Sequence, residues 1–305
     1  ANSSGATSTI TVADVNDAPV VSDAGATLVY TEGDSATVID GTLTITDADD
    51  TNMEGATITI SSGYESSEDV LAFTNANGIT GSWDSGNGVL TLSGSASKAN
   101  YETAFESITY QNTNTDDPNN TNRTITWVVS DGIANSSGAT STITVADVND
   151  APVVSDAGGT LSFAAGSSAT VIDGSLTITD VDDTNIEGAT ITISSGYQAS
   201  EDVLALGNTG LGISVANNSG GVLTLTGSTT KANYETALES ITYQNTDAGS
   251  PNTSDRIVTW LVSDGDADSA AGVTSTISVS APSLHHYAVS YDGGSTTNNA
   301  NGPNC

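Results

Sequence analysis

The 305-residue sequence has very little of several residue types, and each shortage excludes a class of protein. It contains one cysteine, Cys305, so no disulfide can form within the chain. No apolar run approaches the roughly 18 residues that predict a membrane-spanning helix, so we expect no direct membrane insertion. Near-absence of cysteine, lysine and arginine is typical of large secreted bacterial surface proteins, so we expect an extracellular location on a bacterial cell surface.

Positive charge is almost missing, because four Lys and Arg residues stand against 37 acids and give a net charge of −33. Nucleic acids and anionic membranes bind through basic patches, so neither is an expected partner. The carboxylates cannot be neutralised by cations of the chain, and their mutual repulsion destabilises a compact state. We therefore expect an external cation, and a hard dication fits best.

Catalytic patterns are also missing. The sequence has two histidines, and it shows no nucleophile–base pair, glycine-rich phosphate loop or zinc-ligand spacing. We therefore expect that the protein is not an enzyme.

What the sequence does contain is a long repeat. The stretch from Ala1 to Gly25 recurs letter for letter from Ala134, and the same offset persists as far as the pair Trp127 and Trp260. A fixed long period predicts an array of like modules. The phase of the repeat predicts the last strand and linker of a preceding repeat in 1–17, repeat 1 in 18–150, repeat 2 in 151–283, and a different, truncated module in 284–305.

Short segments in which apolar residues alternate with Thr or Ser predict strands. Up to the end of the first copy of the Trp segment they are Ser8–Val12, in the preceding repeat, and Leu28–Tyr30, Thr42–Thr46, Thr57–Ser61, Val89–Leu92, Ile108–Gln111 and Thr124–Ser130, in repeat 1. Gly, Asn and Asp clusters separate them at turn spacing. This pattern predicts an all-β chain of tandem Greek-key β-sandwich domains.

One segment in each repeat has helical spacing instead. Tyr101, Ala104, Phe105 and Ile108 recur at helical intervals, and Ser97 stands where an N-cap is expected. We expect one short helix per repeat, capped by Ser97 or Thr230. Trp127 and Trp260 are expected in the core.

Two acidic runs in each repeat are candidates for metal binding. Asp14-Val15-Asn16-Asp17 and its copy from Asp147 stand at the module junctions, each followed by Ala-Pro. Carboxylate, amide and backbone oxygens along an extended segment suit Ca²⁺, which takes six to eight oxygen ligands. Asp47 and Asp49, with their copies Asp180 and Asp182, follow an early strand. Solvated aspartate-rich turns are the competing interpretation of these runs.

These motifs resemble those of tandem bacterial cadherin-like repeats from large secreted adhesins of the RTX type. The resemblance covers about residues 1–283; the DVNDAP linker carries it most specifically, and the DAD and DVD runs less so. It implies cadherin-like or immunoglobulin-like sandwiches with Ca²⁺ at their junctions. Carried over by motif, one site has the ligands Asp14, Asn16, Asp17, Asp47 and Asp49. The next site has Asp147, Asn149, Asp150, Asp180 and Asp182.

The resemblance also implies a ligand from the preceding module, because cadherins use an early glutamate for the ion beyond their own C-terminal end. Repeat 1 has Glu32 and is followed by the acidic linker. Repeat 2 has Ala165 at that position and is followed by Ser278-Val279-Ser280, without the acids. Shared ligation predicts this joint presence and joint absence, although drift explains it too.

Other repeated polar residues leave two interpretations open. Glu68-Asp69 and Glu201-Asp202 are either ligands or turn residues. Asp131 and Asp264, in VSDG, favour a hairpin. Arg123 and Arg256 are expected to pair with a nearby carboxylate.

These features favour a calcium-stiffened extender, or stalk, of a secreted surface adhesin, whose partners are calcium and neighbouring repeats or like subunits. One alternative is a subunit of an extracellular filament completed by strand exchange through residues 1–13. The other is a carbohydrate-binding module that binds glycans. Aromatic residues are only 5% of the chain, and for that alternative Trp83 is the candidate, since Ala216 stands at the matching position of repeat 2.

Overall fold

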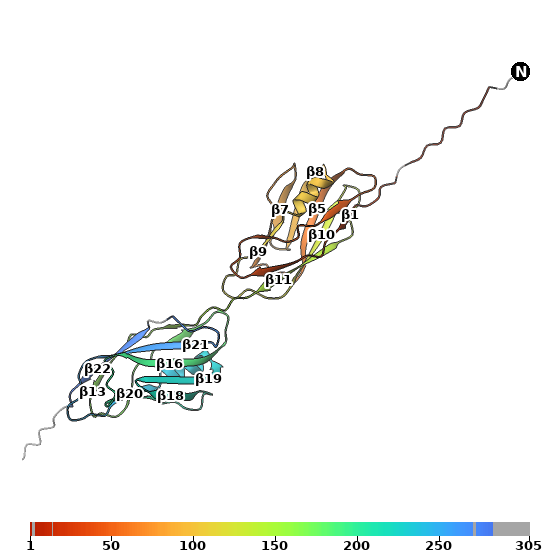
Figure 1. Ribbon diagram of the computed structural model, residues 1–305. Coiled ribbons are helices and arrows are strands. Elements are labelled where there is room, and N and C mark those ends of the chain that lie inside the picture. The colour runs from red at the N-terminus through yellow and green to blue at the C-terminus, as the bar shows by residue number, and fades with distance from the viewer. Residues whose placement is uncertain (2–3, 14, 271–272, 283–305) are drawn as a thin grey trace, which may run out of the picture. The chain divides into compact units, whose positions relative to one another are not determined.

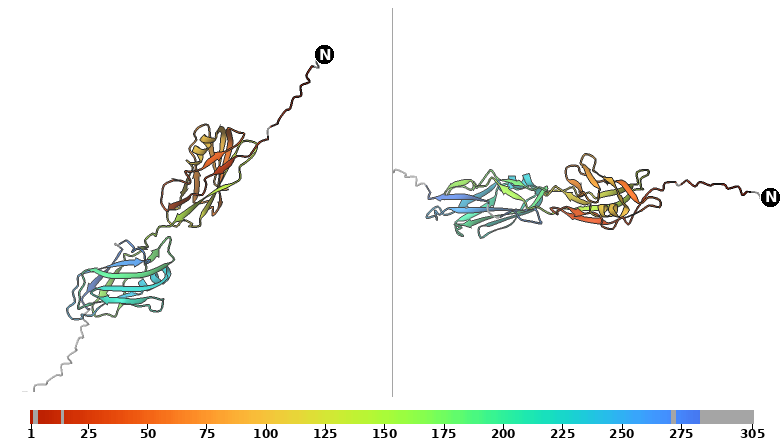
Figure 2. Two further views of the ribbon diagram at one scale, coloured as in Figure 1. Left: turned by 45° about the vertical axis from the view of Figure 1, so that its right-hand side comes forward. Right: turned by 90° about the horizontal axis from the view of Figure 1, so that it is seen from above.

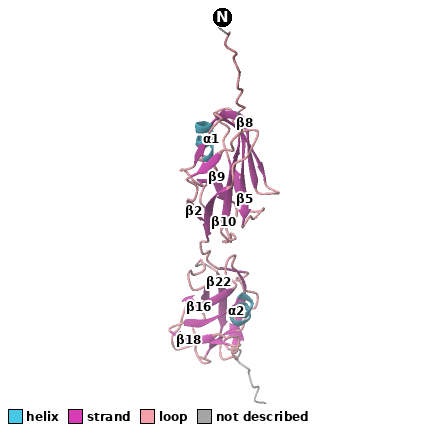
Figure 3. Ribbon diagram, turned by 90° about the vertical axis from the view of Figure 1, so that its right-hand side faces the viewer, coloured by secondary structure: helices cyan, strands magenta, loops and turns pink. Residues whose placement is uncertain are grey.

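The computed structural model describes residues 1, 4–13, 15–270 and 273–282, and the chain divides into two compact units. Unit 1 is Ala1–Asp150 and unit 2 is Ala151–Cys305. Each unit consists of strands and one short helix among its described residues (Figures 1 and 3). The predicted all-β class with one helix per repeat is therefore confirmed. Asp14 and the predicted truncated module in 284–305 lie outside the described residues.

Unit 1 contains one large sheet and two small ones. The large sheet runs in the order β2 (Thr27–Thr31), β11 (Ala139–Ala146), β10 (Arg123–Ser130), β5 (Asn52–Ser62), β8 (Val89–Ser97) and β7 (Thr80–Asp84). The small sheets are β3 (Thr37–Val38) with β9 (Thr109–Asn112) and β6 (Asp69–Ala72), and β1 (Val20–Ser22) with β4 (Thr44–Thr46). β2 is parallel to β11, whereas every other pair is antiparallel.

Unit 2 repeats this topology strand for strand. Its large sheet runs in the order β13 (Thr160–Ala164), β22 (Thr274–Ser280), β21 (Arg256–Ser263), β16 (Asn185–Ser195), β19 (Val222–Thr230) and β18 (Ser214–Ser219). The small sheets are β14 (Thr170–Val171) with β20 (Ile241–Asn245) and β17 (Asp202–Leu206), and β12 (Val153–Ser155) with β15 (Thr177–Thr179).

The sheets of each unit face a common core, and the alternation of side chains explains why. Along β10, Ile125, Trp127 and Val129 are buried while the intervening Thr and Val residues face outward. Ile45 of β4 and Tyr110 of β9 belong to the same apolar cluster, so the small sheets cover the inner face of the large one (Figure 2). Period-two alternation thus produces a two-layer sandwich.

The helices form where the sequence predicts them. α1 (Lys98–Phe105) begins after Ser97, whose hydroxyl accepts a hydrogen bond from Asn100 N at 3.3 Å. α2 (Lys231–Leu238) is capped in the same way by Thr230. Tyr101 and Phe105 are fully buried, so each helix packs its apolar side into the core. Trp127 and Trp260 are also fully buried, which confirms the prediction for the two tryptophans.

One predicted strand is not formed. Residues 4–13 include Ser8–Val12, and the structure assigns them to no strand, although residues 6–13 have the same sequence as β11. β11 pairs with β10 on one side and β2 on the other, whereas the first copy has no such partners within the described part of unit 1. The assignment of 1–17 to a preceding repeat remains a prediction.

Candidate metal centres at the acidic loops

The loop after β4 is held by its own first aspartate. Oδ1 of Asp47 accepts hydrogen bonds from the backbone N–H groups of Asp49, at 3.1 Å, and Asp50, at 2.8 Å. These bonds close the short loop before β5 begins. The other oxygen, Oδ2, is buried and has no hydrogen-bond partner among the described residues. A buried carboxylate oxygen without a donor is costly, which makes this atom the first indication of a ligand site.

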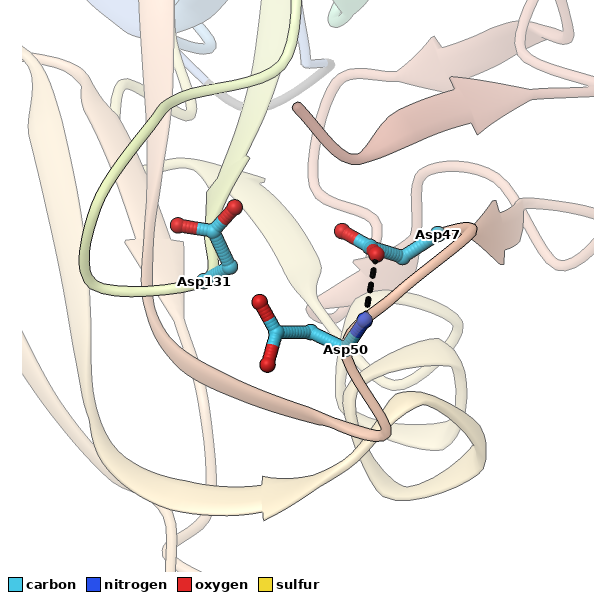
Figure 4. Close-up of side chains that lie close together, drawn as sticks. All are labelled: Asp47, Asp50 and Asp131. Atoms are coloured by element: carbon cyan, nitrogen blue, oxygen red, sulfur yellow. Dashed lines mark hydrogen bonds between the residues drawn. The ribbon is translucent and has the colours of Figure 1, made fainter. Parts of the chain in front are cut away.

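Asp131 joins this loop from the end of β10. The carboxylates of Asp47, Asp50 and Asp131 each offer an oxygen, and these oxygens lie within 4.8 Å of one another (Figure 4). Oδ1 of Asp131 accepts from Ile133 N at 2.6 Å and Ala134 N at 2.7 Å. Three carboxylates therefore converge from two loops that are far apart in sequence.

The pKa values of the three aspartates reflect this crowding of negative charge. Burial raises the pKa of Asp50, and the carboxylates of Asp49, Asp47 and Asp131 raise it further. The pKa of Asp131 is lowered, chiefly because the N–H of Ala134 donates to it, and the amide of Asn16 contributes. The pKa of Asp47 is lowered by the N–H of Asp50 above all. Backbone donors thus keep two of the three groups ionised.

Linker residues approach the same loops within unit 1. Asn16 Nδ2 donates to Oδ2 of Asp131 at 3.0 Å, and the backbone N–H of Asp17 donates to Oδ2 of Asp49 at 3.1 Å. The structure therefore places Asn16, Asp17 and Asp49 beside the cluster, but of the residues predicted for the first site only Asp47 contributes a carboxylate to it, and ligation by the others remains a prediction. The fifth, Asp14, lies outside the described residues.

Unit 2 repeats the convergence. Asp180, Asp183 and Asp264 offer oxygens within 4.8 Å of one another, and Oδ2 of Asp180 is buried without a partner among the described residues. Asp183 N donates to Oδ1 of Asp180 at 2.8 Å. Burial raises the pKa of Asp180, and the carboxylate of Asp182 raises it further.

Sequence reasoning missed part of both clusters. Asp50 and Asp183 were not singled out, and Asp131 and Asp264 were interpreted as hairpin residues. That interpretation is correct as far as it goes, because β10 and β11 are antiparallel neighbours joined by the Asp131 loop. The signal that could have found these four residues is their exact retention at equivalent positions of the two repeats.

The opposite end of unit 1 carries the predicted early glutamate. Glu32 directly follows β2, and its Oε2 accepts a hydrogen bond from Val148 N of the second linker at 2.9 Å. Burial raises the pKa of Glu32, and the neighbouring carboxylates of Asp147 and Asp150 raise it further. The structure therefore places Glu32 beside the linker acids that were predicted to share an ion with it.

The second predicted site draws residues from both units. Asp147, Asn149 and Asp150 belong to unit 1, whereas Asp180 and Asp182 belong to unit 2. Their combination into one site remains a prediction. Within its own unit, Asn149 Nδ2 donates to Asp150 O at 3.2 Å.

The Glu68-Asp69 pair, which the sequence left open between ligand and turn, serves the interior of the unit. Asp69 is buried and receives both Nε and Nη2 of Arg123, at 3.0 to 3.2 Å, and the Tyr110 hydroxyl at 2.6 Å. Glu68 accepts hydrogen bonds from Asn112, Asn114 and the N–H of Asn119. Arg256 and Asp202 form the same pair in unit 2. The predicted pairing of both arginines with a carboxylate is confirmed.

Trp83, the candidate residue of the carbohydrate alternative, is only partly exposed. Its side chain is half-buried and packs edge-on against Tyr64, with ring centroids 6.2 Å apart. The position matched to it in unit 2 is also not Ala216. Trp83 pairs with Leu90, whereas the equivalent Leu223 pairs with Asn218. The register of β18 is already shifted by one residue at Ser214, and a bulge between Val215 and Asn217 shifts it by one more.

The donor set fits a hard dication. Each cluster offers carboxylate oxygens only, with a buried oxygen that lacks a donor, and Ca²⁺ prefers such ligands. In unit 1 the ion would be held by Asp47, Asp50 and Asp131, with Asn16, Asp17 and Asp49 beside them. When bound it would supply the positive charge that the chain lacks. No helix in the described part of the chain is long and apolar enough to cross a membrane.

Comparison with known proteins gives limited matches. No family model matches the chain. Halomucin of Haloquadratum walsbyi is 44% identical over 78 residues, which is 24% of this chain and 1% of halomucin, so the chain spans only a very small part of that protein.

Among solved structures, Drosophila N-cadherin EC1-4 is similar with a TM-score of 0.35 and 14% identity, over 88% of this chain and 50% of that one. Mouse cadherin-23 EC22-24 matches with a TM-score of 0.36 and 13% identity, over 87% and 67%. At these scores the likeness carries no argument, and the fold rests on the strand pairing described above.

Proposed function

We propose that this chain is part of a calcium-stiffened extender of a secreted surface protein, in which acidic loops and linkers bind Ca²⁺ between successive sandwich modules. The observation that carries the proposal is the convergence of three carboxylates at the same place in both units. In each cluster one carboxylate oxygen is buried and has no donor among the residues that the structure describes. The placement of Asn16 and Asp17 beside one such loop supports a role for the linker.

The second support is electrostatic. Carboxylates within 4.8 Å of one another repel, and the pKa values of Asp50 and Asp183 are raised first by burial and then by these neighbouring charges. A bound dication removes the repulsion and ties the linker to the loop. At a calcium concentration about a hundredfold above the Kd, one site stabilises the folded state by about 2.7 kcal/mol.

The mechanical consequence is the proposed function itself. A free linker lets successive modules reorient, whereas a linker held by an ion limits that motion. An array of such modules extends away from a cell surface and presents whatever lies at its far end. The bacterial origin, the secreted location and the adhesin role belong to this proposal; the short match to halomucin supports a surface protein.

The test combines calcium titration with small-angle scattering on the whole chain. We expect calorimetry to show calcium binding, and we expect the maximum dimension to fall and the distribution of dimensions to broaden when chelator is added. The variant Asp131→Asn with Asp264→Asn should weaken binding at both clusters, and Asp116→Asn with Asp117→Asn is the matched control for charge on an exposed loop. Dimensions that do not change with calcium contradict the stiffening role.

A further inference from the structure

Each unit contains a single lysine, and both lysines make the same unusual contact. Lys98 is the first residue of α1, and Lys231, its counterpart in the second repeat, is the first residue of α2. Lys98 Nζ donates to the backbone carbonyls of Asp47 at 2.9 Å and Asp50 at 2.7 Å. Lys231 Nζ donates to the carbonyls of Asp180, at 2.8 Å, and Asp183. In a chain with 37 acids, neither ammonium forms an ion pair with a carboxylate in the described structure; both bind main-chain oxygens.

These bonds act on the two ends of the metal-site loop. The loop spans residues 47–51 between β4 and β5. Asp47 is its first residue and Asp50 its last but one, and both contribute a carboxylate to the cluster with Asp131. The ammonium holds their main-chain carbonyls, while the carboxylates of the same residues converge on Asp131 (Figure 4). The lysine therefore holds the main chain of two of the three acids without a hydrogen bond to their side chains.

The lysine is itself anchored to a rigid element. Ser97 caps α1, and Tyr101 and Phe105 secure the helix in the core. One turn further on, Glu102 Oε1 accepts a hydrogen bond from Ile45 N of β4 at 2.7 Å. Glu235 makes the same bond to Ile178 N in unit 2, at 2.8 Å. Helix, strand and loop thus form one connected support behind each cluster.

We propose that Lys98 and Lys231 are positioning residues of the two cation sites. By holding the main chain of the loop, each lysine brings the loop carboxylates together before an ion binds. The inference rests on the proposed function, because it concerns the same clusters. Groups that orient metal ligands from behind typically contribute about 10- to 100-fold to metal affinity. The positive charge of the lysine repels an incoming dication. The gain in calcium affinity must therefore come from preorganisation, because the loop is already ordered when the ion binds.

The test uses the whole chain and measures calcium affinity by calorimetry together with the melting of each unit, with and without calcium. Lys98→Met keeps most of the apolar stem and removes the donors. We expect calcium to bind the unit 1 cluster about 10- to 100-fold more weakly, while the unit 2 cluster keeps its affinity. Lys231→Met should give the mirror result, and Lys98→Arg, which retains charge and donors, should restore part of the affinity.

The outcomes separate the possible failures. If the original chain does not bind calcium, the proposed function is wrong and the positioning role falls with it. A second outcome is that the chain binds calcium, Lys98→Met leaves the calcium affinity within twofold, and the melting temperature falls equally with and without calcium. The lysine then stabilises only the fold, and the inference is overturned. If Lys98→Met fails to fold, Lys98→Gln, which shortens the side chain and removes its charge, decides: a calcium affinity within twofold of the original also overturns the inference.

Discussion

Unit 1 and unit 2 share their strand order, their helix, their buried arginine and one acidic cluster, yet they differ at the end opposite that cluster. Glu32 N donates to Ala146 O at 2.8 Å, and Ala165 N makes the same bond to Ser280 O at 2.9 Å. The backbone is therefore the same whether glutamate or alanine stands there. The glutamate is dispensable for the fold, and its presence in unit 1 alone coincides with the acidic linker that follows unit 1.

The comparison separates two kinds of acid. Asp69 and Asp202 are retained because the interior of each unit needs them, and their partners lie within the same unit. Glu32 makes its side-chain contact to the linker residue Val148. Acids of the first kind should recur in every repeat, whereas acids of the second kind should recur only where the next linker is acidic.

The largest effect should come from breaking what the units share. Arg123→Met leaves the Asp69 carboxylate buried without its counter-charge, and the loss of one partner of a buried pair costs about 3 to 5 kcal/mol. We expect calorimetry to show a large drop in the melting temperature of unit 1, with unit 2 unchanged.

Arg256→Met supplies the matched control and should destabilise unit 2 alone. Adding Asp69→Asn to Arg123→Met removes the buried charge and should recover part of the stability. Equal destabilisation of both units by Arg123→Met would show that they unfold together, and would contradict our expectation that each unit melts separately.

Much of this architecture could be predicted from the sequence. The burial of Trp127 and Tyr101 followed from period-two and helical spacing, because apolar patterning dominates where a side chain is deep in the core. Strands β1, β3 and β6 were not predicted, because each has four residues or fewer and too few positions reveal an alternation. β7 was not predicted because its sequence, TGSWD, contains one large apolar residue and therefore no alternation. Ser8–Val12 has the alternation but no strand beside it in the described structure, and a strand is a property of a pair.

The site was predictable only in part, for a related reason. Asp47 and Asp49 are two residues apart, so their proximity follows directly from the sequence. The arrival of Asp131 depends on the pairing of β10 with β5, which brings residues that are distant in sequence to one end of the sheet. The lysine contacts were also invisible, because main-chain carbonyls have no sequence signature.

A second shared feature predicts an equal response of both units to acid. Asp40 is buried, which alone would raise its pKa, but hydrogen bonds from Ser141, Thr42 and the N–H of Ala26 lower it overall. Asp173 is held likewise by Ser275 and Ser175. A carboxyl whose pKa is lower in the folded state contributes stability that is present above its unfolded pKa of about 4 and is lost as pH falls through the folded value.

Ser141→Ala tests this feature, because the Ser141 hydroxyl donates to Asp40 at 2.7 Å and accepts from Trp127 Nε1 at 3.0 Å. We expect unit 1 to lose about 1 to 3 kcal/mol near pH 7, since a buried donor and a buried acceptor each lose a partner. The further loss of stability as the solution is acidified below about pH 4 should become smaller, since the pKa of Asp40 rises toward its unfolded value.

Ser275→Ala should affect unit 2 by the same amount; an effect in one unit only would break the equivalence of the two buried networks. Melting in chelator, across pH, measures both.

The smallest effect should come from the feature that distinguishes the units. Glu32→Ala removes one carboxylate from the group with Asp147 and Asp150, so we expect calcium to bind there about tenfold more weakly, or about 1.4 kcal/mol. In chelator, unit 1 should not lose stability, because the pKa of Glu32 is raised by its burial and then by repulsion from Asp147 and Asp150, and alanine relieves both costs. Ala165→Glu is the reciprocal variant: the segment after β22 begins Ala281-Pro282 and offers no aspartate beside Ser280, so a glutamate alone should not create calcium binding. A gain of binding in Ala165→Glu would mean that the glutamate, and not its union with an acidic linker, makes the site, and the joint presence in unit 1 would then be coincidence.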